Sequence, residues 1–207
     1  MEKAENNISA FIIEKGTEGF SIGEPEDKMG VRGSSTCELI FEDCIVPKNN
    51  MLGKVGEGFK IAMSTLNGGR IGVAAQAIGL AQGALDEAIK YIKEREVNGK
   101  KVSQFQNTQF LIADLQTRID AARLLVYKAA DMKDRGEEYG YLASMSKFLA
   151  SEIAMKTTEK AVQLFGGNGY LKKYPVERMM RDAKVTEIYE GTSEVQKIVI
   201  ATWLGIK

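Results

Sequence analysis

The sequence predicts a mainly α-helical protein, in which a four-helix, up-and-down bundle follows a few short β-strands. Two patterns support this prediction: apolar residues recur with the period of helices from about residue 58 onward, and with the period of strands before residue 50. The chain also has 207 residues, of which 44% are apolar. A chain of this size and composition can bury a sizeable core.

The strands come first. Residues 8–14 are apolar and β-branched and are followed by a turn rich in glycine. A second strand is predicted over residues 37–42, where side chains alternate in polarity. Its apolar face consists of Cys37, Leu39 and Phe41. Because these strands are too few to close a sheet, we expect residues 1–52 to be the C-terminal remnant of a β-domain, and residues 53–207 to be a helical-bundle domain.

The first long helix is predicted from about Gly58. Two rows of small or apolar residues repeat along it at every seventh position, which is the pattern of a helix that packs along a seam. The rows are Ile71, Ile78, Leu85 and Ile92, and Ala74, Ala81 and Ala88. The alanines should let a neighbouring helix approach closely.

A second long helix repeats the pattern and should end at Gly136, with Ser103 and Gln106 as a capping box at its start. Its apolar rows are Ile112, Ile119 and Val126, and Leu115, Ala122 and Ala129. A third helix is predicted over residues 138–165, where the glycines at 166 and 167 end it. Long antiparallel helices with short links form a bundle.

Two shorter helices complete the predicted bundle. Pro175 should open one that runs to about Lys184, since proline suits the first helical position. The last begins near Ser193, which forms a second predicted capping box with Gln196. Its apolar face contains Val195, Ile198, Val199 and Trp203.

The composition excludes several classes of protein. The 28 Lys and Arg residues balance the 28 Asp and Glu residues, which argues against nucleic acid or a membrane surface as partner. No apolar run approaches the roughly 18 residues of a membrane helix, so we expect a soluble, cytoplasmic protein. Histidine is absent, so we expect no HExxH zinc site, no two-His iron site and no His-based triad. The two cysteines, Cys37 and Cys44, should be reduced.

A glycine-rich segment at residues 163–170 is the first candidate for a binding site. Three glycines within four positions are explained by a tight turn at the end of a helix. Alternatively, the absence of Cβ atoms lets backbone N–H groups approach a phosphate or a flat ring. Residues 53–58 are also rich in glycine, but their spacing matches no phosphate-binding pattern.

The second candidate is Glu190, which lies in the turn just before the last helix. On one interpretation it is a solvated loop carboxylate, and the Thr-Ser pair that follows only caps the helix. On the other it is a general base beside the positive end of a helix. The lack of histidine favours the second interpretation, because few other groups could move a proton.

Four segments together resemble the acyl-CoA dehydrogenase family, and in particular its short-chain, butyryl-CoA-type members. They are residues 27–36 (DKMGVRGSST), 69–74 (GRIGVA), 165–170 (FGGNGY) and 188–193 (IYEGTS). The resemblance implies a FAD-dependent oxidoreductase of fatty acid β-oxidation with a C-terminal four-helix bundle. It also implies a homotetramer, arranged as a dimer of dimers, which passes electrons to an electron-transfer flavoprotein.

The resemblance assigns roles to individual residues. Glu190 matches the family's catalytic base, which removes the α-proton of an acyl-CoA thioester while the β-hydrogen leaves as hydride to the flavin, giving the trans-2-enoyl-CoA. Some relatives carry the base at the position of Gly69, which has no side chain here. The implied substrate-binding residues are Asn67, Gly68, Gly69, Arg70 and Gly191. The implied FAD-binding residues are Arg95, Gln106, Gln163, Leu164, Phe165, Gly166, Gly167, Thr192, Ser193 and Glu194.

The sequence departs from the family in two places near these residues. Residues 95–99 read Arg-Glu-Val-Asn-Gly where Arg-x-Gln/Thr-Phe-Gly is common, and Asn67 replaces a frequent Asp. Two alternatives to the dehydrogenase remain open: a truncated or split, non-catalytic fragment that forms an oligomeric helical bundle, and an acyl-CoA oxidase.

Overall fold

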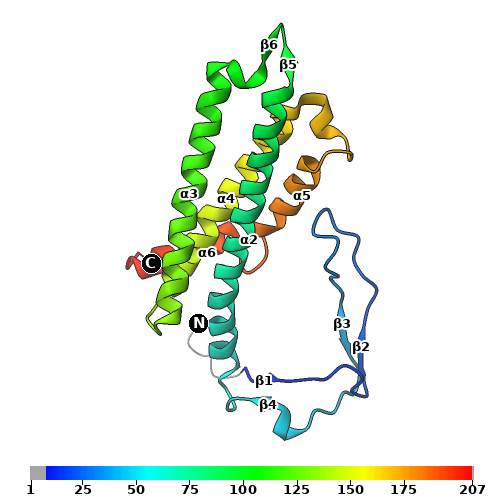
Figure 1. Ribbon diagram of the computed structural model, residues 1–207. Coiled ribbons are helices and arrows are strands. Elements are labelled where there is room, and N and C mark those ends of the chain that lie inside the picture. The colour runs from blue at the N-terminus through cyan, green and yellow to red at the C-terminus, as the bar shows by residue number, and fades with distance from the viewer. Residues whose placement is uncertain (1–7, 207) are drawn as a thin grey trace. The chain divides into compact units, whose positions relative to one another are not determined.

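The computed structural model describes residues 8–206. Its strands are β1 (Ala10–Phe11), β2 (Phe20–Ile22), β3 (Leu39–Phe41), β4 (Met51–Leu52), β5 (Glu96–Val97) and β6 (Lys100–Lys101). Its α-helices are α2 (Gly58–Glu94), α3 (Gln106–Asp134), α4 (Gly140–Phe165), α5 (Val176–Thr186) and α6 (Ser193–Trp203). Short 3-10 helices are η1 (Lys48–Asn50), η2 (Val102–Gln104) and η3 (Gly166–Tyr170). The chain is mainly helical, as predicted (Figure 1).

The chain divides into two compact units, Met1–Leu66 and Asn67–Lys207. In the first unit, β1 pairs with β4 and β2 pairs with β3, both antiparallel. The rings of Phe20 and Phe41 stack across the second pair, with centroids 4.9 Å apart. The strands are shorter than predicted because each finds a partner over only two or three residues. Whether a domain boundary lies at residues 52 and 53 stays a prediction.

The second unit is built around α2, α3 and α4, whose buried small and apolar side chains meet in one cluster. The two rows predicted on α2 belong to the cores of this unit: Ala74, Ala81 and Ala88 have no exposed surface, and Leu85 is 1% exposed. On α3, Ile119, Ala122 and Ala129 are equally inaccessible. Helix α4 also packs against α5 and α6. The predicted helical rows are therefore confirmed.

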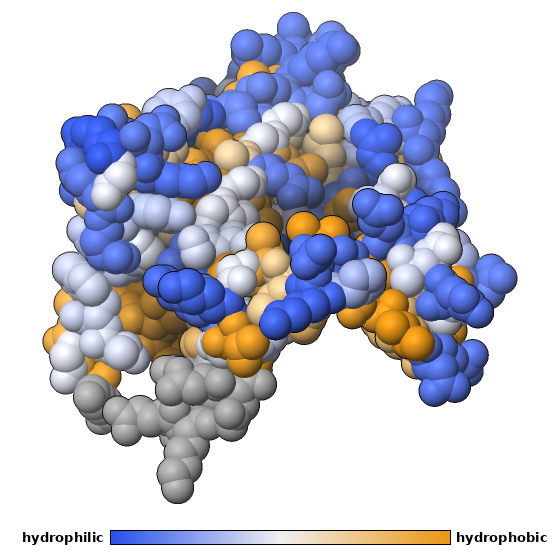
Figure 2. Space-filling view, turned by 90° about the horizontal axis from the view of Figure 1, so that it is seen from below, coloured by the Kyte–Doolittle hydropathy of each residue, from blue (hydrophilic) through white to orange (hydrophobic). Residues whose placement is uncertain are grey.

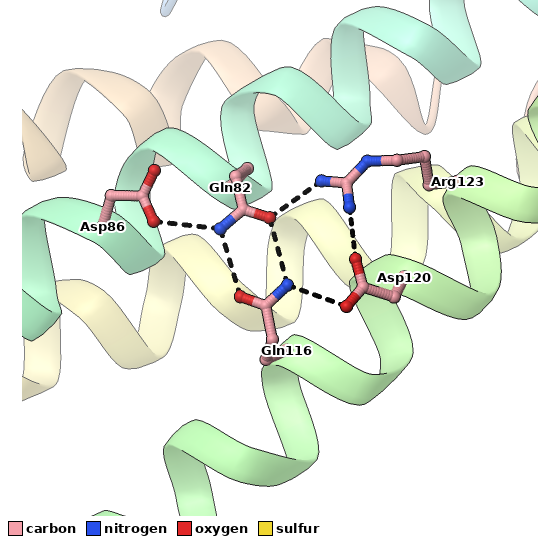
Figure 3. A network of polar contacts seen from close by, with 5 residues as sticks. All are labelled: Gln82, Asp86, Gln116, Asp120 and Arg123. Atoms are coloured by element: carbon pink, nitrogen blue, oxygen red, sulfur yellow. Dashed lines mark hydrogen bonds and ion pairs between the residues drawn. The ribbon is translucent and has the colours of Figure 1, made fainter.

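A polar network joins α2 to α3 outside this core (Figure 3). The side-chain amides of Gln82 and Gln116 donate to each other's oxygens, at 3.1 and 3.3 Å. Arg123 donates to the oxygen of Gln82 at 2.8 Å and also pairs with Asp120. Because the network is only partly buried, it fixes the register of the two helices more than it contributes to stability.

Both predicted capping boxes are wrong. Helix α3 begins after Phe105 and has no side-chain cap. The side chain of Gln104 instead caps the 3-10 helix η2, where it accepts from the backbone N–H of Lys101 at 2.9 Å. Helix α6 is capped by Thr192, whose hydroxyl accepts from the N–H of Val195 at 3.4 Å. Ser, Thr and Gln can all serve as caps, so the choice between neighbouring positions depends on tertiary contacts.

Helix α6 buries polar rather than apolar side chains. Ser193 and Gln196 face the bundle, whereas Val195, Ile198 and Trp203 of the predicted apolar face are 40%, 65% and 52% exposed. Figure 2 shows that apolar side chains also lie among polar ones on one face of the molecule. The apolar face of α6 is thus left uncovered over much of its area.

No described helix combines the length and apolar character that crossing a membrane requires. Cys37 and Cys44 are both free thiols, as predicted.

Candidate functional site

The link between α5 and α6 carries Glu190 in a strained conformation. Its φ is +56° and that of Gly191 is +92°, so two successive residues adopt the left-handed region. This conformation costs a non-glycine residue roughly 1–2 kcal/mol. A Cβ at Gly191 would also lie 2.8 Å from the amide nitrogen of Gln196. Gly191 is therefore required both by its backbone angle and by its neighbour.

Buried side chains from three helices hold the two carbonyl groups of this turn. Gln196 Nε2 donates to the carbonyl of Glu190 at 3.1 Å and to that of Gly191 at 2.9 Å. Lys147 Nζ donates to the carbonyl of Gly191 at 2.6 Å. Arg70 Nε makes a weaker, 3.5 Å contact with the carbonyl of Glu190. We call this arrangement of Arg70, Lys147 and Gln196 the carbonyl clamp.

The carboxylate of Glu190 is packed against α2. A Cβ built on Gly69 would lie 2.7 Å from Glu190 Oε2, which leaves no room there for a larger residue unless the carboxylate moves. Oε2 is buried and accepts no hydrogen bond from the described residues. A buried carboxylate oxygen without a donor is free to accept a proton, as a general base must.

Arg70 lies beside this carboxylate and is only 4% exposed. Its Nη1 donates to Asn67 Oδ1 at 2.9 Å and to Ser144 Oγ at 3.2 Å. Burial lowers the pKa of Arg70 from its ordinary value, and the negative charge of Glu190 acts in the opposite direction. The asparagine that replaces the family's frequent Asp thus still accepts a hydrogen bond from Arg70.

The structure brings together most of the residues predicted around the base. Asn67, Gly69 and Arg70 on α2 meet the turn of Glu190 and Gly191, although 120 residues separate Arg70 from Glu190. Gly68 instead faces α3, where a Cβ would lie 3.5 Å from Lys133 Nζ. Substrate binding by these residues stays a prediction.

The glycine-rich segment forms the 3-10 helix η3 and not an open loop. Phe165 before it is 5% exposed and stacks on Tyr91 of α2, with ring centroids 4.0 Å apart. Asn168 Nδ2 donates to the hydroxyl of Tyr91 at 2.9 Å. A Cβ on Gly166 or Gly167 would meet nothing within 4 Å. The backbone at these two glycines is therefore open to a ligand, while η3 is anchored to α2.

Gly169 is required for packing, which leads to a stability prediction. A Cβ there would lie 2.4 Å from the backbone oxygen of Val162, a rigid neighbour. We expect Gly169→Ala to lower the free energy of unfolding by about 1–3 kcal/mol, the usual cost of overpacking. Chemical denaturation would measure it, with Gly167→Ala as the matched control. Equal stability of the two variants would contradict the described packing of η3.

Two further predicted FAD-binding residues lie where α2 and α3 are joined, at the upper end of the bundle in Figure 1. Arg95 follows α2, its N–H donates to the carbonyl of Tyr91 at 2.9 Å, and its side chain is exposed. Gln106 is the first residue of α3 and is exposed as well. The hairpin of β5 and β6 lies between them. Neither residue is brought to Glu190 within this chain.

Gln163 and Leu164 lie in the last turn of α4. Three more predicted residues lie at the start of α6: its N-cap Thr192, followed by Ser193 and Glu194. They line a polar groove of about 210 Å³ with, among others, Lys184 and Glu187. The hydroxyl of Ser193 is buried and has no partner among the described residues. Hydrogen bonds from its own backbone N–H and from Thr192 lower the pKa of Glu194. An orphaned hydroxyl at a helix N-terminus fits a polar or anionic ligand group.

Sequence analysis missed Lys147 and Gln196 of the carbonyl clamp as functional candidates. The sequence predicts a capping role for Gln196 and singles out no role for Lys147. The available signal was a lysine within the small-residue row of α4, where Ser144, Ser146, Ala150 and Ser151 are all buried. A lysine at a core position is rare unless its charge has a partner.

Comparison with known proteins supplies an independent finding. Residues 56–205 match the family described as "Acyl-CoA dehydrogenase, C-terminal domain". The sequence is 60% identical over 199 residues to the short-chain-specific acyl-CoA dehydrogenase of Clostridium acetobutylicum. The aligned region covers 96% of this chain and 52% of that protein. The chain thus spans about half the length of the curated relatives it matches.

Two solved structures have the same fold. Butyryl-CoA dehydrogenase from Megasphaera elsdenii superposes with a TM-score of 0.96 at 53% identity, over 99% of this chain and 53% of that one. A chain from work on the electron transferring flavoprotein of Acidaminococcus fermentans gives a TM-score of 0.96 at 59% identity. It covers 98% of this chain and 53% of that chain.

Proposed function

The chain belongs to the acyl-CoA dehydrogenase family, and from this premise we propose that Glu190 is the base in the α,β-dehydrogenation of a short-chain acyl-CoA to the trans-2-enoyl-CoA. The observation that carries the proposal is the state of its carboxylate. Oε2 is buried and lacks a hydrogen-bond donor among the described residues, and the side chain lies against the bare backbone of Gly69. A buried carboxylate oxygen with no donor nearby keeps its lone pairs open to an incoming proton.

The α-proton of a thioester is weakly acidic, so the carbonyl must be polarised while the proton leaves. The backbone N–H of Glu190 is the proposed donor to that carbonyl, and the hydrogen bonds of the carbonyl clamp position the peptides that follow it. Arg70 contributes positive charge beside Glu190. We assign substrate contacts to Asn67, Gly69 and Arg70, and to Gly191, which border the carboxylate.

FAD fits the remaining residues as the cofactor. The open backbone at Gly166 and Gly167 and the orphaned hydroxyl of Ser193 could each receive part of a large dinucleotide. We assign its binding to Arg95, Gln106, Gln163, Leu164, Phe165, Thr192 and Glu194 in addition to these. When bound, FAD supplies the acceptor for the β-hydrogen, which leaves as hydride.

We further propose that the protein is a homo-oligomer and that an electron-transfer flavoprotein accepts its electrons. Large apolar side chains stay exposed on α3 and α6, among them Phe110, Leu124 and Ile198 at 64%, 69% and 65%. A second copy of the chain could cover such faces. The similarity to a chain from the work on the electron transferring flavoprotein of Acidaminococcus fermentans supports the electron partner.

Reconstitution tests the proposed function. The purified chain is mixed with FAD and with the N-terminal half of the Megasphaera elsdenii butyryl-CoA dehydrogenase, and dye reduction by butyryl-CoA is followed. We expect a yellow complex that reduces the dye. The two halves of the Megasphaera enzyme, mixed in the same way, serve as the positive control. If they are active together and the mixture with this chain is not, the dehydrogenase proposal is wrong.

A further inference from the structure

Lys147 is the most unusual residue in the described core. It lies on α4 and its side chain has no exposed surface. Moving a charged amine out of water is costly unless a partner compensates. Its partner is not a carboxylate but the backbone carbonyl of Gly191, at 2.6 Å. A charged residue that is buried to hold one carbonyl of a loop calls for a functional explanation.

The surroundings of Lys147 favour the charged form only in part. Desolvation lowers its pKa to about 8, and the positive charge of Arg70 on α2 acts in the same direction. Three carboxylates oppose this effect: Glu187 after α5, Glu190 in the turn, and Glu194 on α6. The ammonium group is therefore present at neutral pH, at a cost that a methionine of similar length would avoid.

The peptide between Gly191 and Thr192, which Lys147 holds together with Gln196, has little steric restraint of its own. Gly191 has no side chain, and glycine populates both signs of φ with similar ease. Because a peptide unit is planar, fixing the carbonyl of Gly191 also fixes the N–H of Thr192, the N-cap of α6. Gln196 holds the preceding carbonyl, of Glu190, in the same way. Without Lys147, Gln196 would be the single described side-chain donor to the carbonyl of Gly191.

We propose that Lys147 is a positioning residue, whose buried ammonium group fixes the peptide between Gly191 and Thr192 and thereby, through the turn, aims the carboxylate and N–H of Glu190 at the substrate. The catalytic part of this inference rests on the proposed function. The positioning part concerns the chain's own residues and can be measured without substrate or flavin.

Hydrogen exchange measured by mass spectrometry on residues 187–196 tests the positioning directly. We expect Lys147→Met to increase exchange there about tenfold, the effect of losing a charged hydrogen bond. The melting temperature near pH 7 should equal or exceed that of the wild type, since a costly buried charge is removed. Lys156→Met is the matched control, because Lys156 lies on the same helix, is exposed, and pairs with Asp114 at 3.2 Å. It should change neither measurement appreciably.

The pH profile separates positioning from a merely structural role. In the wild type, protection of residues 187–196, corrected for intrinsic exchange, should fall as the pH rises through about 8, where Lys147 loses its proton. In Lys147→Met it should not respond. The folded pKa lies below the ordinary value of about 10.4, so the folded chain binds fewer protons between the two values. As the pH rises above about 8, the free energy of unfolding of the wild type should therefore increase relative to that of Lys147→Met, while the protection of residues 187–196 falls.

Three outcomes overturn the inference. Two concern Lys147→Met: unchanged hydrogen exchange at residues 187–196, or exchange that increases equally throughout the chain together with a lower melting temperature. The third is a wild type in which the protection of residues 187–196 does not change with pH. The last needs no variant, so it decides even if Lys147→Met does not fold. In the reconstituted enzyme, kcat should fall about threefold to tenfold with KM little changed. A normal kcat in Lys147→Met, together with faster exchange at residues 187–196, would overturn the catalytic part alone. An inactive reconstituted wild type would overturn the proposed function and leave the exchange result valid.

Discussion

Glu190→Gln should lower turnover of butyryl-CoA by about 10²–10⁴-fold in the reconstituted enzyme, the usual contribution of a general base. Glutamine has nearly the same shape and keeps the backbone N–H of residue 190, so the carbonyl clamp and the polarisation of the thioester should survive. Only the ability to take the α-proton is lost. Dye reduction and single-turnover bleaching of the flavin both measure the effect.

Two observations make this test selective. Flavin absorbance should remain in Glu190→Gln, because none of the proposed FAD contacts is altered. Glu159→Gln is a suitable control, since Glu159 is an exposed carboxylate on α4 that pairs with Lys160 at 3.3 Å and lies outside the proposed site. An unchanged rate in Glu190→Gln would remove the assignment of the base.

Gly69→Ala should separate stability from activity. Replacing glycine by alanine inside a helix stabilises it by up to about 1 kcal/mol. The new Cβ would, however, lie 2.7 Å from Glu190 Oε2, so the flexible carboxylate must move aside. We expect unchanged or slightly greater stability together with at least about a tenfold loss of turnover, since a displacement near 1 Å can cost about 10²-fold.

Gly72→Ala is the matched control for this prediction. Gly72 lies on the same helix, and a Cβ there would meet nothing within 4 Å. It should increase the melting temperature and leave turnover close to that of the wild type. If the two alanine variants have the same kcat, the described position of the Glu190 carboxylate is wrong.

The sequence predicted the helices well because their signal is repeated many times. The seven-residue rows on α2 and α3 extend over several turns, so single exceptions matter little. Local capping signals failed because they depend on one or two residues. Gln196 had the right spacing for a cap at Ser193, but its amide binds the carbonyls of Glu190 and Gly191 instead. The strands at residues 10–11 and 51–52 are too short to be placed from pattern alone.

The candidate site was predictable only in its most recognisable residues. Glu190 and Arg70 could be identified because the motifs around them resemble a family. Lys147 offered one signal, its place in the small-residue row of α4, and its partner could not be predicted because that partner is a backbone carbonyl 44 residues away. The role of Gly169 was also hidden, because its neighbour is the backbone oxygen of Val162. Contacts to the main chain leave little trace in a sequence.

The left-handed backbone at Glu190 has an evolutionary consequence. Glycine would adopt the same φ without strain, so Glu190→Gly should relieve roughly 1 kcal/mol while it abolishes the base. Glutamate and glycine codons can differ by a single base. In a lineage that no longer needs the reaction, a single base change could therefore produce Glu190→Gly, which is expected to stabilise the chain and to inactivate it. Only selection for turnover keeps a carboxylate at this position.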